Sequence, residues 1–287
     1  MKETFLTFDV EQSITIESCH SELTSVSFEG VVNFLKQTIP VGTIYSLNNN
    51  AKTLDLVVVL EKSCVKALTN FENVIDIALL GYDDSVCTLH TFGGLNQQIV
   101  EGSLFYNWAC TEANVIYRKS NAEQLPCVSQ QVYEVKSQYF NRLFKIEMIK
   151  ASSFLDGATY FIGINRFELA VFMLQQAVEL TYRCFLNLMR GKDIKCHELY
   201  VLRRNIKRFA PQLLGAFSDN EKEELRYLDV LEKGYCDARY NREYKIRKEK
   251  VILLHQKVKE LHSRSFDLFA SIMVKLNNYI RKVNSAY

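Results

Sequence analysis

The fold of the C-terminal half is set by residues 166–192, RFELAVFMLQQAVELTYRCFLNLMRGK. Their apolar members recur at intervals of three and four, which places them on one face of an α-helix: Phe167, Ala170, Val171, Leu174, Ala177, Val178, Tyr182 and Phe185. The segment closes on Arg190, Gly191 and Lys192. Positive charge is favoured at a helix C-terminus, and glycine readily takes the left-handed conformation that ends a helix. The pattern predicts a long amphipathic helix whose apolar face is covered by other helices.

The segments on both sides of this helix show the same periodicity. Helical spacing of apolar residues predicts four further helices, at 132–155, 199–209, 221–235 and 251–272. Pro211 ends the second of these, because the residue before a proline is disfavoured in the helical region. Five helices with short connections predict an all-α bundle over residues 132–287.

The N-terminal half has a mixed pattern. Short β-branched runs predict strands at 43–47, 54–60, 86–92 and 113–117, and helical patterns lie at 31–38, 65–80 and 95–102. Gly93 and Gly94 predict a break in the chain, and the stretch 119–131 with Pro126 predicts a linker. We therefore expect an α+β protein of two domains, a small mixed α/β domain at residues 1–125 and the helical bundle at 132–287.

The formal charge is distributed unevenly along the chain. Residues 1–131 carry 7 Lys and Arg against 15 Asp and Glu (7 − 15 = −8), whereas residues 132–287 carry 28 against 18 (28 − 18 = +10). An acidic half joined to a basic half predicts two domains that have different partners or that attract each other. The alternative is that the long helices carry solvated Lys and Arg side chains.

The cysteines and the apolar stretches indicate the cellular compartment. Eight cysteines are scattered without a CxxC pair, which excludes a common zinc spacing and provides no disulfide framework. No secretory pattern follows Met1, and no stretch reaches the ~18 apolar residues that a membrane helix needs. We therefore expect a cytoplasmic protein with reduced thiols, no cofactor, no bound metal and no membrane association.

Three short motifs in the helical half occur in the order and spacing of one family. They are FMLQQAVEL at 172–180, KCHEL at 195–199 and YCDARY at 235–240. Together they resemble the HEPN family (higher eukaryotes and prokaryotes nucleotide-binding domains) over roughly residues 135–275. The resemblance implies a helical bundle that binds a nucleotide or RNA. Many members are metal-independent ribonucleases whose motifs meet across a homodimer cleft.

The resemblance also implies a site. The ribonuclease signature is an arginine followed after four to six residues by a histidine. The arginine stabilises the phosphate, and the histidine moves protons during attack by the RNA 2′-hydroxyl. Arg239 matches the arginine, but Tyr244 stands where the histidine would be, and His255 lies too far along the chain. Tyrosine has an ordinary pKa of ~10, against ~6.5 for histidine, so Tyr244 is a weak general base at neutral pH. The catalytic candidates, Arg239 and Tyr244, therefore predict binding of a phosphate more strongly than cleavage of RNA.

Four residues are candidates for binding a nucleotide or RNA phosphate: Lys195, His197, Arg239 and Arg242. A guanidinium can hold phosphate with two parallel hydrogen bonds, and Arg242 is expected one turn after Arg239 on the same helix. Lys195 and His197 lie near the start of a helix, whose free amides attract anions. The alternatives are that His197 only fixes the helix end and that Arg239 forms a buried ion pair with Asp237 or a glutamate.

The N-terminal half resembles a degenerate minimal nucleotidyltransferase domain. Active members hold a triphosphate with a Gly-Ser turn after the first strand and metal ions with an Asp-x-Asp pair on the next strand. Here Ser46 has no glycine before it, and Asp55 has no carboxylate two positions away on either side. One carboxylate is a poor site for a divalent cation. The degenerate site, Ser46 and Asp55, predicts lost transferase activity, unless Asp76, Asp83 or Asp84 supplies a further carboxylate.

These observations support three hypotheses. The leading one is a bacterial, cytoplasmic protein whose HEPN bundle binds a nucleotide or RNA phosphate, forms a homodimer through the helical domain and follows an inactive transferase-like domain. The second is a metal-independent ribonuclease of toxin or defence type that uses Arg239 and Tyr244. The third is a pair of interaction modules without a small ligand, in which the acidic domain covers the basic bundle as an antitoxin domain would.

Overall fold

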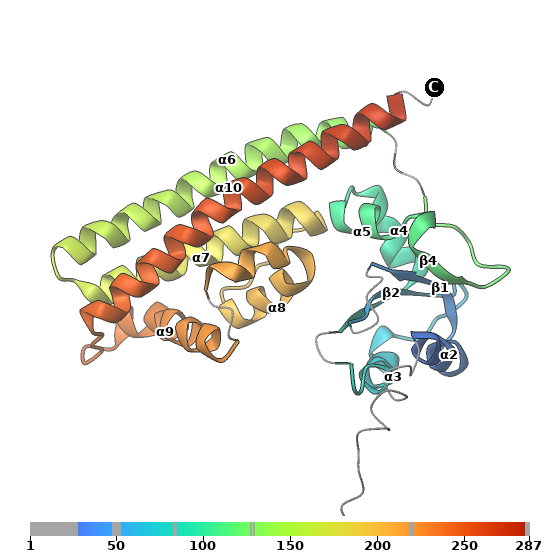
Figure 1. The fold of residues 1–287 in the computed structure, drawn as a ribbon, viewed down its shortest axis with the longest axis horizontal. Helices are drawn as coiled ribbons and strands as arrows, with labels where there is room; N and C mark the ends of the chain where they lie inside the picture. Colours follow the sequence, from blue (N-terminus) through green and yellow to red (C-terminus); the bar gives the residue numbers. More distant parts are fainter. Residues whose placement is uncertain are drawn as a thin grey trace, which may run out of the picture.

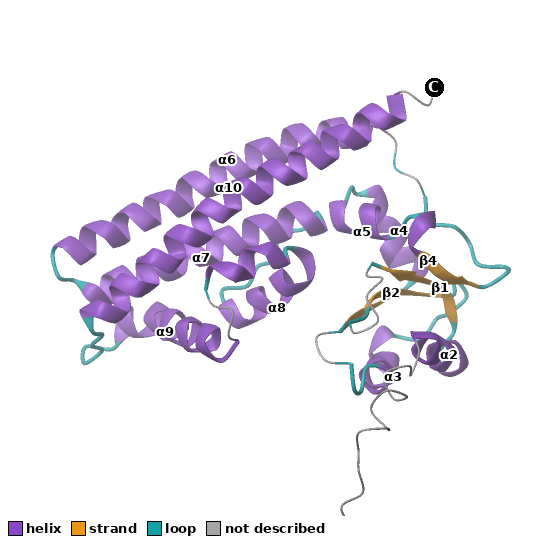
Figure 2. Ribbon diagram, in the orientation of Figure 1, coloured by secondary structure: helices purple, strands orange, loops and turns teal. Residues whose placement is uncertain are grey.

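The computed structural model describes residues 28–47, 53–82, 85–126, 128, 130–217 and 221–284. A part that contains a β-sheet is built from the N-terminal half, and an elongated set of helices is built from the C-terminal half (Figure 1). All the strands of the described chain lie in the N-terminal part (Figure 2). The predicted α+β class is therefore confirmed.

The sheet has four strands in the described residues. They are β1 (Val41–Ser46), β2 (Asp55–Leu60), β3 (Val86–His90) and β4 (Val115–Arg118). Their order is β3-β2-β1-β4, with β1 antiparallel to β2 and β4, and β2 parallel to β3. The sequence of β2, DLVVVL, is buried after its first residue, as expected for an inner strand that is covered on both faces.

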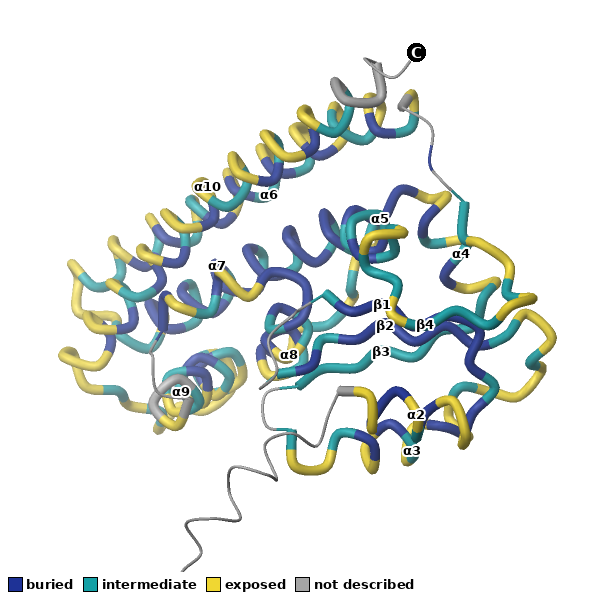
Figure 3. The backbone as a smooth tube through the Cα atoms, turned by 45° about the vertical axis from the view of Figure 1, so that its right-hand side comes forward, coloured by how far each residue is buried: buried dark blue, intermediate teal, exposed yellow. Residues whose placement is uncertain are grey.

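Helices cover both faces of the sheet (Figure 3). One face carries α2 (Phe28–Thr38), the 3-10 helix η2 (Leu68–Phe71) and α3 (Glu72–Ala78). The other carries α4 (Phe92–Val100) and α5 (Leu104–Ala109), which the 3-10 helix η3 (Glu112–Asn114) connects to β4. Because side chains alternate along a strand, Leu56 and Val58 join the first core and Val57 and Val59 join the second.

Two details of the N-terminal part differ from the sequence prediction. Gly93 and Gly94 do not break the chain but lie in the first turn of α4, where the Thr91 hydroxyl accepts a hydrogen bond from the Gly94 amide (3.1 Å). Such a capping hydroxyl satisfies an amide that the helix start leaves without a partner. Helix α5 was not predicted, because its six residues are too few to show a helical period.

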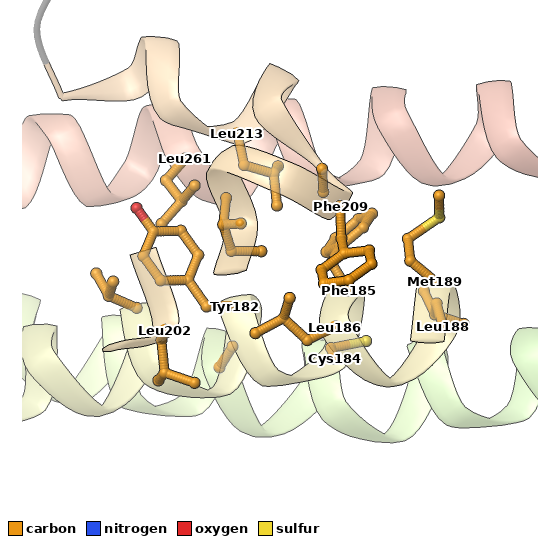
Figure 4. Close-up of a cluster of buried hydrophobic side chains, with 14 of the residues drawn as sticks. Tyr182, Cys184, Phe185, Leu186, Leu188, Met189, Leu202, Phe209, Leu213 and Leu261 are labelled. Carbon is orange, nitrogen blue, oxygen red and sulfur yellow. The ribbon is translucent and has the colours of Figure 1, made fainter. Parts of the chain in front are cut away.

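The C-terminal part contains the five predicted helices. They are α6 (Gln130–Gly163), α7 (Phe167–Arg190), α8 (Leu199–Phe209), α9 (Glu221–Tyr240) and α10 (Lys248–Asn284), with the 3-10 helix η4 (Pro211–Ala216) after α8. Helix α7 is the centre of the bundle and contacts each of the other four. Its residues Tyr182, Phe185 and Leu186 pack with Phe209 and Leu213 (Figure 4). Gly191 ends α7 with a φ of 74°, in the left-handed conformation that the sequence predicted.

One apolar core joins the sheet to the bundle. Val57 and Val59 of β2 belong to the same buried cluster as Leu186 and Leu188 of α7. Between the two parts, the Ser103 hydroxyl donates a buried hydrogen bond to the Met189 carbonyl oxygen (2.9 Å). The sheet and the bundle therefore pack directly against each other.

The boundaries 1–125 and 132–287 stay predictions, and residues 1–27 lie outside the described residues. The region between them, 119–126, contains no helix or strand, and α6 begins at Gln130. Among the helices of the described chain, none is long and apolar enough to cross a membrane.

Candidate functional site

Arg239 lies exposed in the last turn of α9. The carbon of its guanidinium is 4.0 Å from the centre of the Tyr235 ring and 5.0 Å from that of Tyr240. Its Nε donates a hydrogen bond to the Tyr235 carbonyl oxygen (2.8 Å). The helix dipole favours a cation in this turn. The alternative of a buried ion pair is wrong, because the side chain faces solvent and is held by aromatic rings.

The position of Tyr235 follows from the close contact between α7 and α9. Gly234 faces α7, and a Cβ atom at this position would lie only 2.2 Å from Cγ1 of Val171. This approach places the Tyr235 ring 6.2 Å from the ring of Phe172, nearly parallel at 24°. The guanidinium of Arg239 lies 5.5 Å from the Phe172 ring. A glycine inside α9 therefore positions the aromatic residues on which Arg239 rests.

His197 approaches the same tyrosine from the loop before α8. Its ring is parallel to Tyr235 within 8°, with the ring centres 6.2 Å apart. Its Nδ1 lies 2.8 Å from Oε1 of Glu179, whose side chain is only 3% exposed, whereas that of His197 is 61% exposed. An ionised carboxylate only accepts hydrogen bonds, so Nδ1 carries the proton and Nε2 is the ring nitrogen left for a ligand.

Glu179 is held firmly although it lies on the buried face of α7. Its carboxylate accepts hydrogen bonds from Arg183 (3.3 Å), Gln175 (3.4 Å) and Gln176 (3.3 Å). A buried carboxylate is tolerated when such partners compensate for its lost hydration. We call Phe172, Glu179, His197, Tyr235 and Arg239 the α7–α9 cluster.

The cluster combines chemical groups that suit a nucleic acid. A guanidinium lies over aromatic faces, and an oriented imidazole lies beside them. Aromatic rings can stack with bases, and arginine can bind phosphate with two hydrogen bonds. An imidazole held by a carboxylate can also accept or donate a proton. The arrangement therefore has the groups for binding a phosphate beside a base and for moving a proton there.

The other predicted phosphate ligands are less well placed. Helix α9 ends at Tyr240, so Arg242 does not lie on the same helix as Arg239, as the sequence had predicted. Arg242 and Lys195 are both exposed, and no contact described in the structure joins either of them to Arg239. The chain leaves α9 too early to continue the helical register. Binding by Lys195 and Arg242 stays a prediction.

The amides at the start of α8 already have an anionic partner. The Leu199 amide donates a hydrogen bond to Oε2 of Glu232 (2.9 Å). Burial raises the pKa of Glu232, which the carboxylates of Glu198 and Glu179 raise further, while the Leu199 hydrogen bond lowers it. Glu232 therefore competes with any external anion at this helix end. The expected anion site at the start of α8 is at least partly occupied by the protein itself.

Tyr244 lines a cavity of about 410 Å³ whose described lining includes no residue of the α7–α9 cluster. Five basic residues line that cavity: Arg226, Lys233, Lys245, Arg247 and Lys250. Burial raises the pKa of Tyr244, and the negative charges of Asp237 and Glu168 raise it further. A higher pKa makes Tyr244 a still weaker proton acceptor at neutral pH. Its partnership with Arg239 in catalysis stays a prediction, whereas His197 and Arg239 share contact with the Tyr235 ring.

Asp55, from the degenerate transferase site, forms an ion pair with Arg208 of α8. Nη2 of Arg208 also donates hydrogen bonds to the Leu56 carbonyl oxygen (3.3 Å) and the Thr88 hydroxyl (3.5 Å). The guanidinium lies 4.8 Å from the centre of the Phe105 ring. Burial lowers the pKa of Arg208 to about 10, so it remains charged at neutral pH. A side chain of the bundle therefore supplies the positive charge beside Asp55, the one carboxylate within the strands of the described chain.

Ser46, the other residue of the degenerate site, is buried at the end of β1, where it pairs with Leu56. Among the described residues, no group of three His, Cys, Asp or Glu side chains could hold a metal ion. Of the three possible further carboxylates, Asp76 lies on α3, and Asp83 and Asp84 lie outside the described residues.

Sequence reasoning missed four residues of these sites: Phe172, Glu179, Tyr235 and Arg208. A signal existed for Glu179, because it falls on the apolar face of α7, between Val178 and Tyr182. A polar residue on a buried helix face needs a partner, and that partner is a functional candidate. No comparable signal existed for Arg208, because its partner is 153 positions away (208 − 55 = 153).

Comparison with known families identifies the helical part. Residues 147–265 match the family model of the HEPN domain. The matched segment runs from within α6 to within α10 and contains the whole α7–α9 cluster. The chain therefore carries a HEPN domain in its helical region, preceded by a mixed α/β region that this match leaves unassigned. No curated protein matches the chain.

Proposed function

We propose that the HEPN domain of this protein binds a nucleotide or an RNA phosphate at the α7–α9 cluster. The observation that carries the proposal is the exposed guanidinium of Arg239 above the Tyr235 ring, with His197 stacked on the same ring. The stacked position limits the rotamers of Arg239, so less side-chain entropy is lost when it binds an anion. The net charge of +10 over residues 132–287 favours approach of a polyanion.

The experiment compares RNA binding by the wild type and by Arg239→Ala, measured by fluorescence anisotropy with a labelled single-stranded oligonucleotide. A hydrogen bond between charged groups contributes about 1.5–3 kcal/mol, so we expect the dissociation constant to rise by roughly 10- to 100-fold. Arg142→Ala is the matched control, since Arg142 is exposed on α6 and lies outside the cluster. Equal weakening by the two substitutions would refute a specific site.

A second candidate function, metal-independent RNA cleavage, is favoured by the Glu179–His197 contact. Such cleavage requires a base for the 2′-hydroxyl proton and a cation for the phosphate. His197 and Arg239 supply these groups on the same aromatic ring, whereas Tyr244 lies in a cavity whose described lining includes neither of them. We infer that His197 takes the acid–base role.

The test is RNA cleavage in the presence of EDTA, with product ends analysed for 2′,3′-cyclic phosphate. His197→Asn and Arg239→Ala are expected to abolish cleavage, and Tyr244→Phe is expected to retain it. Loss of cleavage in Tyr244→Phe with full activity in His197→Asn would reverse the assignment. Binding without cleavage by the wild type would leave the first proposal as the function of the domain.

The α/β region is proposed to have no nucleotidyltransferase activity. The Asp55–Arg208 ion pair supports this, because the guanidinium would have to leave before the carboxylate could bind a divalent cation. Transfer of a labelled nucleotide to RNA or protein in the presence of Mg²⁺, lost in Asp55→Asn, would contradict the proposal.

The contact between the sheet and the bundle gives little support to the third hypothesis, in which the acidic domain covers the basic bundle. The sheet and the bundle share an apolar core and an ion pair whose arginine is buried, so their contact does not rest on exposed charges alone. Salt screens exposed charges much more than buried ones. We therefore expect the docking of the two parts to change little between low and high salt.

A further inference from the structure

A second candidate site lies between the sheet and the bundle. It is a cavity of about 540 Å³, within the range of pockets that hold small molecules. Its walls come from Leu47, which follows β1, from β2, α5 and η3, and from α7, α8, η4 and α10 of the bundle. Its described lining includes no residue of the α7–α9 cluster. A ligand of this cavity would therefore contact both parts of the chain.

Trp108 and Lys275, which both line this cavity, lie in contact. The Nζ of Lys275 is 4.1 Å from the centre of the Trp108 ring, whose face stabilises the ammonium. Burial lowers the pKa of Lys275, so a nearby negative group would stabilise its charged form. The ammonium of Lys275 on the Trp108 ring therefore favours an acceptor that carries negative charge.

The charge of the lining limits the charge of the ligand. The charged residues that line the cavity are Asp55, Arg208 and Lys275. Asp55 and Arg208 neutralise each other in their ion pair, which leaves the charge of Lys275 to be balanced within this lining. A ligand with one negative charge balances it, whereas a triphosphate with several negative charges does not.

The remaining walls suit a flat and largely apolar body. Phe105 and Phe209 meet edge to face with their ring centres 4.8 Å apart. Met189, which Figure 4 shows beside Phe209, and the aliphatic residues Leu268 and Ile272 also line the cavity. Aromatic walls favour ligand rings, which can stack or pack edge to face with them.

We propose that this cavity binds a small aromatic monoanion, whose oxyanion accepts a hydrogen bond from Lys275 Nζ beside the Trp108 ring. Aromatic carboxylates and cyclic nucleoside monophosphates share this chemistry. The ring lies against Phe105 and Phe209, and the negative charge compensates that of Lys275. Because the cavity is built from both parts of the chain, the ligand stabilises their packed arrangement.

The fluorescence of Trp108 tests this proposal directly, because it is the only tryptophan of the chain. The full-length protein is titrated separately with salicylate and with 3′,5′-cyclic AMP and cyclic GMP. We expect a saturable change in emission with at least one of them. Adenosine, which has the ring but no charge, is expected to give no saturable change and controls for light absorption by the base.

Two substitutions separate ligand binding from a general effect on the fold. Lys275→Met removes the ammonium and is expected to weaken binding by about tenfold or more, as for loss of a hydrogen bond between charged groups. Lys259→Met, at an exposed position of the same helix, is the matched control. Ser271→Phe fills the cavity from the exposed side of α10 and is expected to abolish binding with Lys275 intact.

Absence of a saturable change with all three probes in the wild type would overturn the proposal. It would also be overturned by unchanged dissociation constants in both Lys275→Met and Ser271→Phe. The RNA-binding proposal is tested independently: Arg239→Ala is expected to retain the Trp108 titration, and Lys275→Met is expected to retain the Arg239-dependent binding of RNA.

Discussion

Replacement of Arg208 by methionine is expected to destabilise the fold by about 3 kcal/mol. Loss of one partner of a buried ion pair costs about 3–5 kcal/mol, because the other charge stays behind without compensation. The side chain of Arg208 is 6% exposed, but that of Asp55 is 34% exposed, so water can solvate part of the remaining carboxylate. The lower end of the range therefore applies to the ion pair. Loss of the Phe105 contact adds about 1 kcal/mol, and the apolar methionine stem recovers a similar amount.

The assay is urea unfolding followed by far-UV circular dichroism, with a double-mutant cycle that adds Asp55→Asn. For a direct pair, we expect a coupling energy of about 1–3 kcal/mol between the two substitutions. Arg204→Met, at an exposed position of the same helix, is the control and is expected to change stability by less than about 0.5 kcal/mol. A cost below about 1 kcal/mol for Arg208→Met, or a coupling energy near zero, would refute the reasoning.

Three further predictions concern the core and the cluster. Gly234→Ala is expected to cost about 1–3 kcal/mol in urea unfolding, because its Cβ would overlap Val171, whereas Gly157→Ala, with 3.4 Å to its nearest atom, is expected to be tolerated. Burial, aided by the positive charge of Arg190, lowers the pKa of His90 to about 4 in the folded protein. As the pH falls, the unfolded chain therefore binds this proton before the folded protein does, and the free energy of unfolding falls by about 3 kcal/mol between pH 6.5 and 4. A pH series in which His90→Leu shows the same decrease as the wild type would contradict that origin. Glu179→Gln is expected to lower the stability by about 1–3 kcal/mol in calorimetry and to weaken RNA binding, because its amide nitrogen would face the donors that now surround the carboxylate. Unchanged stability would show that these contacts contribute little.

Much of the secondary structure could be predicted because it depends on neighbouring residues. The apolar period of 167–185 and the terminal Gly191 identify α7, and the β-branched run at 54–60 identifies β2. Gly93 and Gly94 were misread as a break because their intrinsic preference is for a turn. The Thr91 cap outweighs that preference and places both glycines in the first turn of a helix. Arg242 was misplaced because the end of α9 at Tyr240 carries no proline or glycine signal in the sequence.

The candidate site was predictable only in part. The motifs that contain His197 and Arg239 could be read from the chain, and the HEPN domain at 147–265 agrees with them. Their shared contact with Tyr235 could not, because it depends on how closely α7 and α9 approach each other. That distance is set by Gly234 against Val171, a contact between residues far apart in sequence.

By itself, the sequence determined the α+β class, the five long helices and the residue types that could bind phosphate, since periodicity and side-chain chemistry are local properties. Only the tertiary structure decided that Arg208 of the bundle neutralises Asp55 of the sheet. It also decided that Glu179 orients His197 and that Trp108 and Lys275 share a cavity. Each of these pairs joins distant parts of the chain, and their distances follow from packing of the whole core rather than from any preference of neighbouring residues.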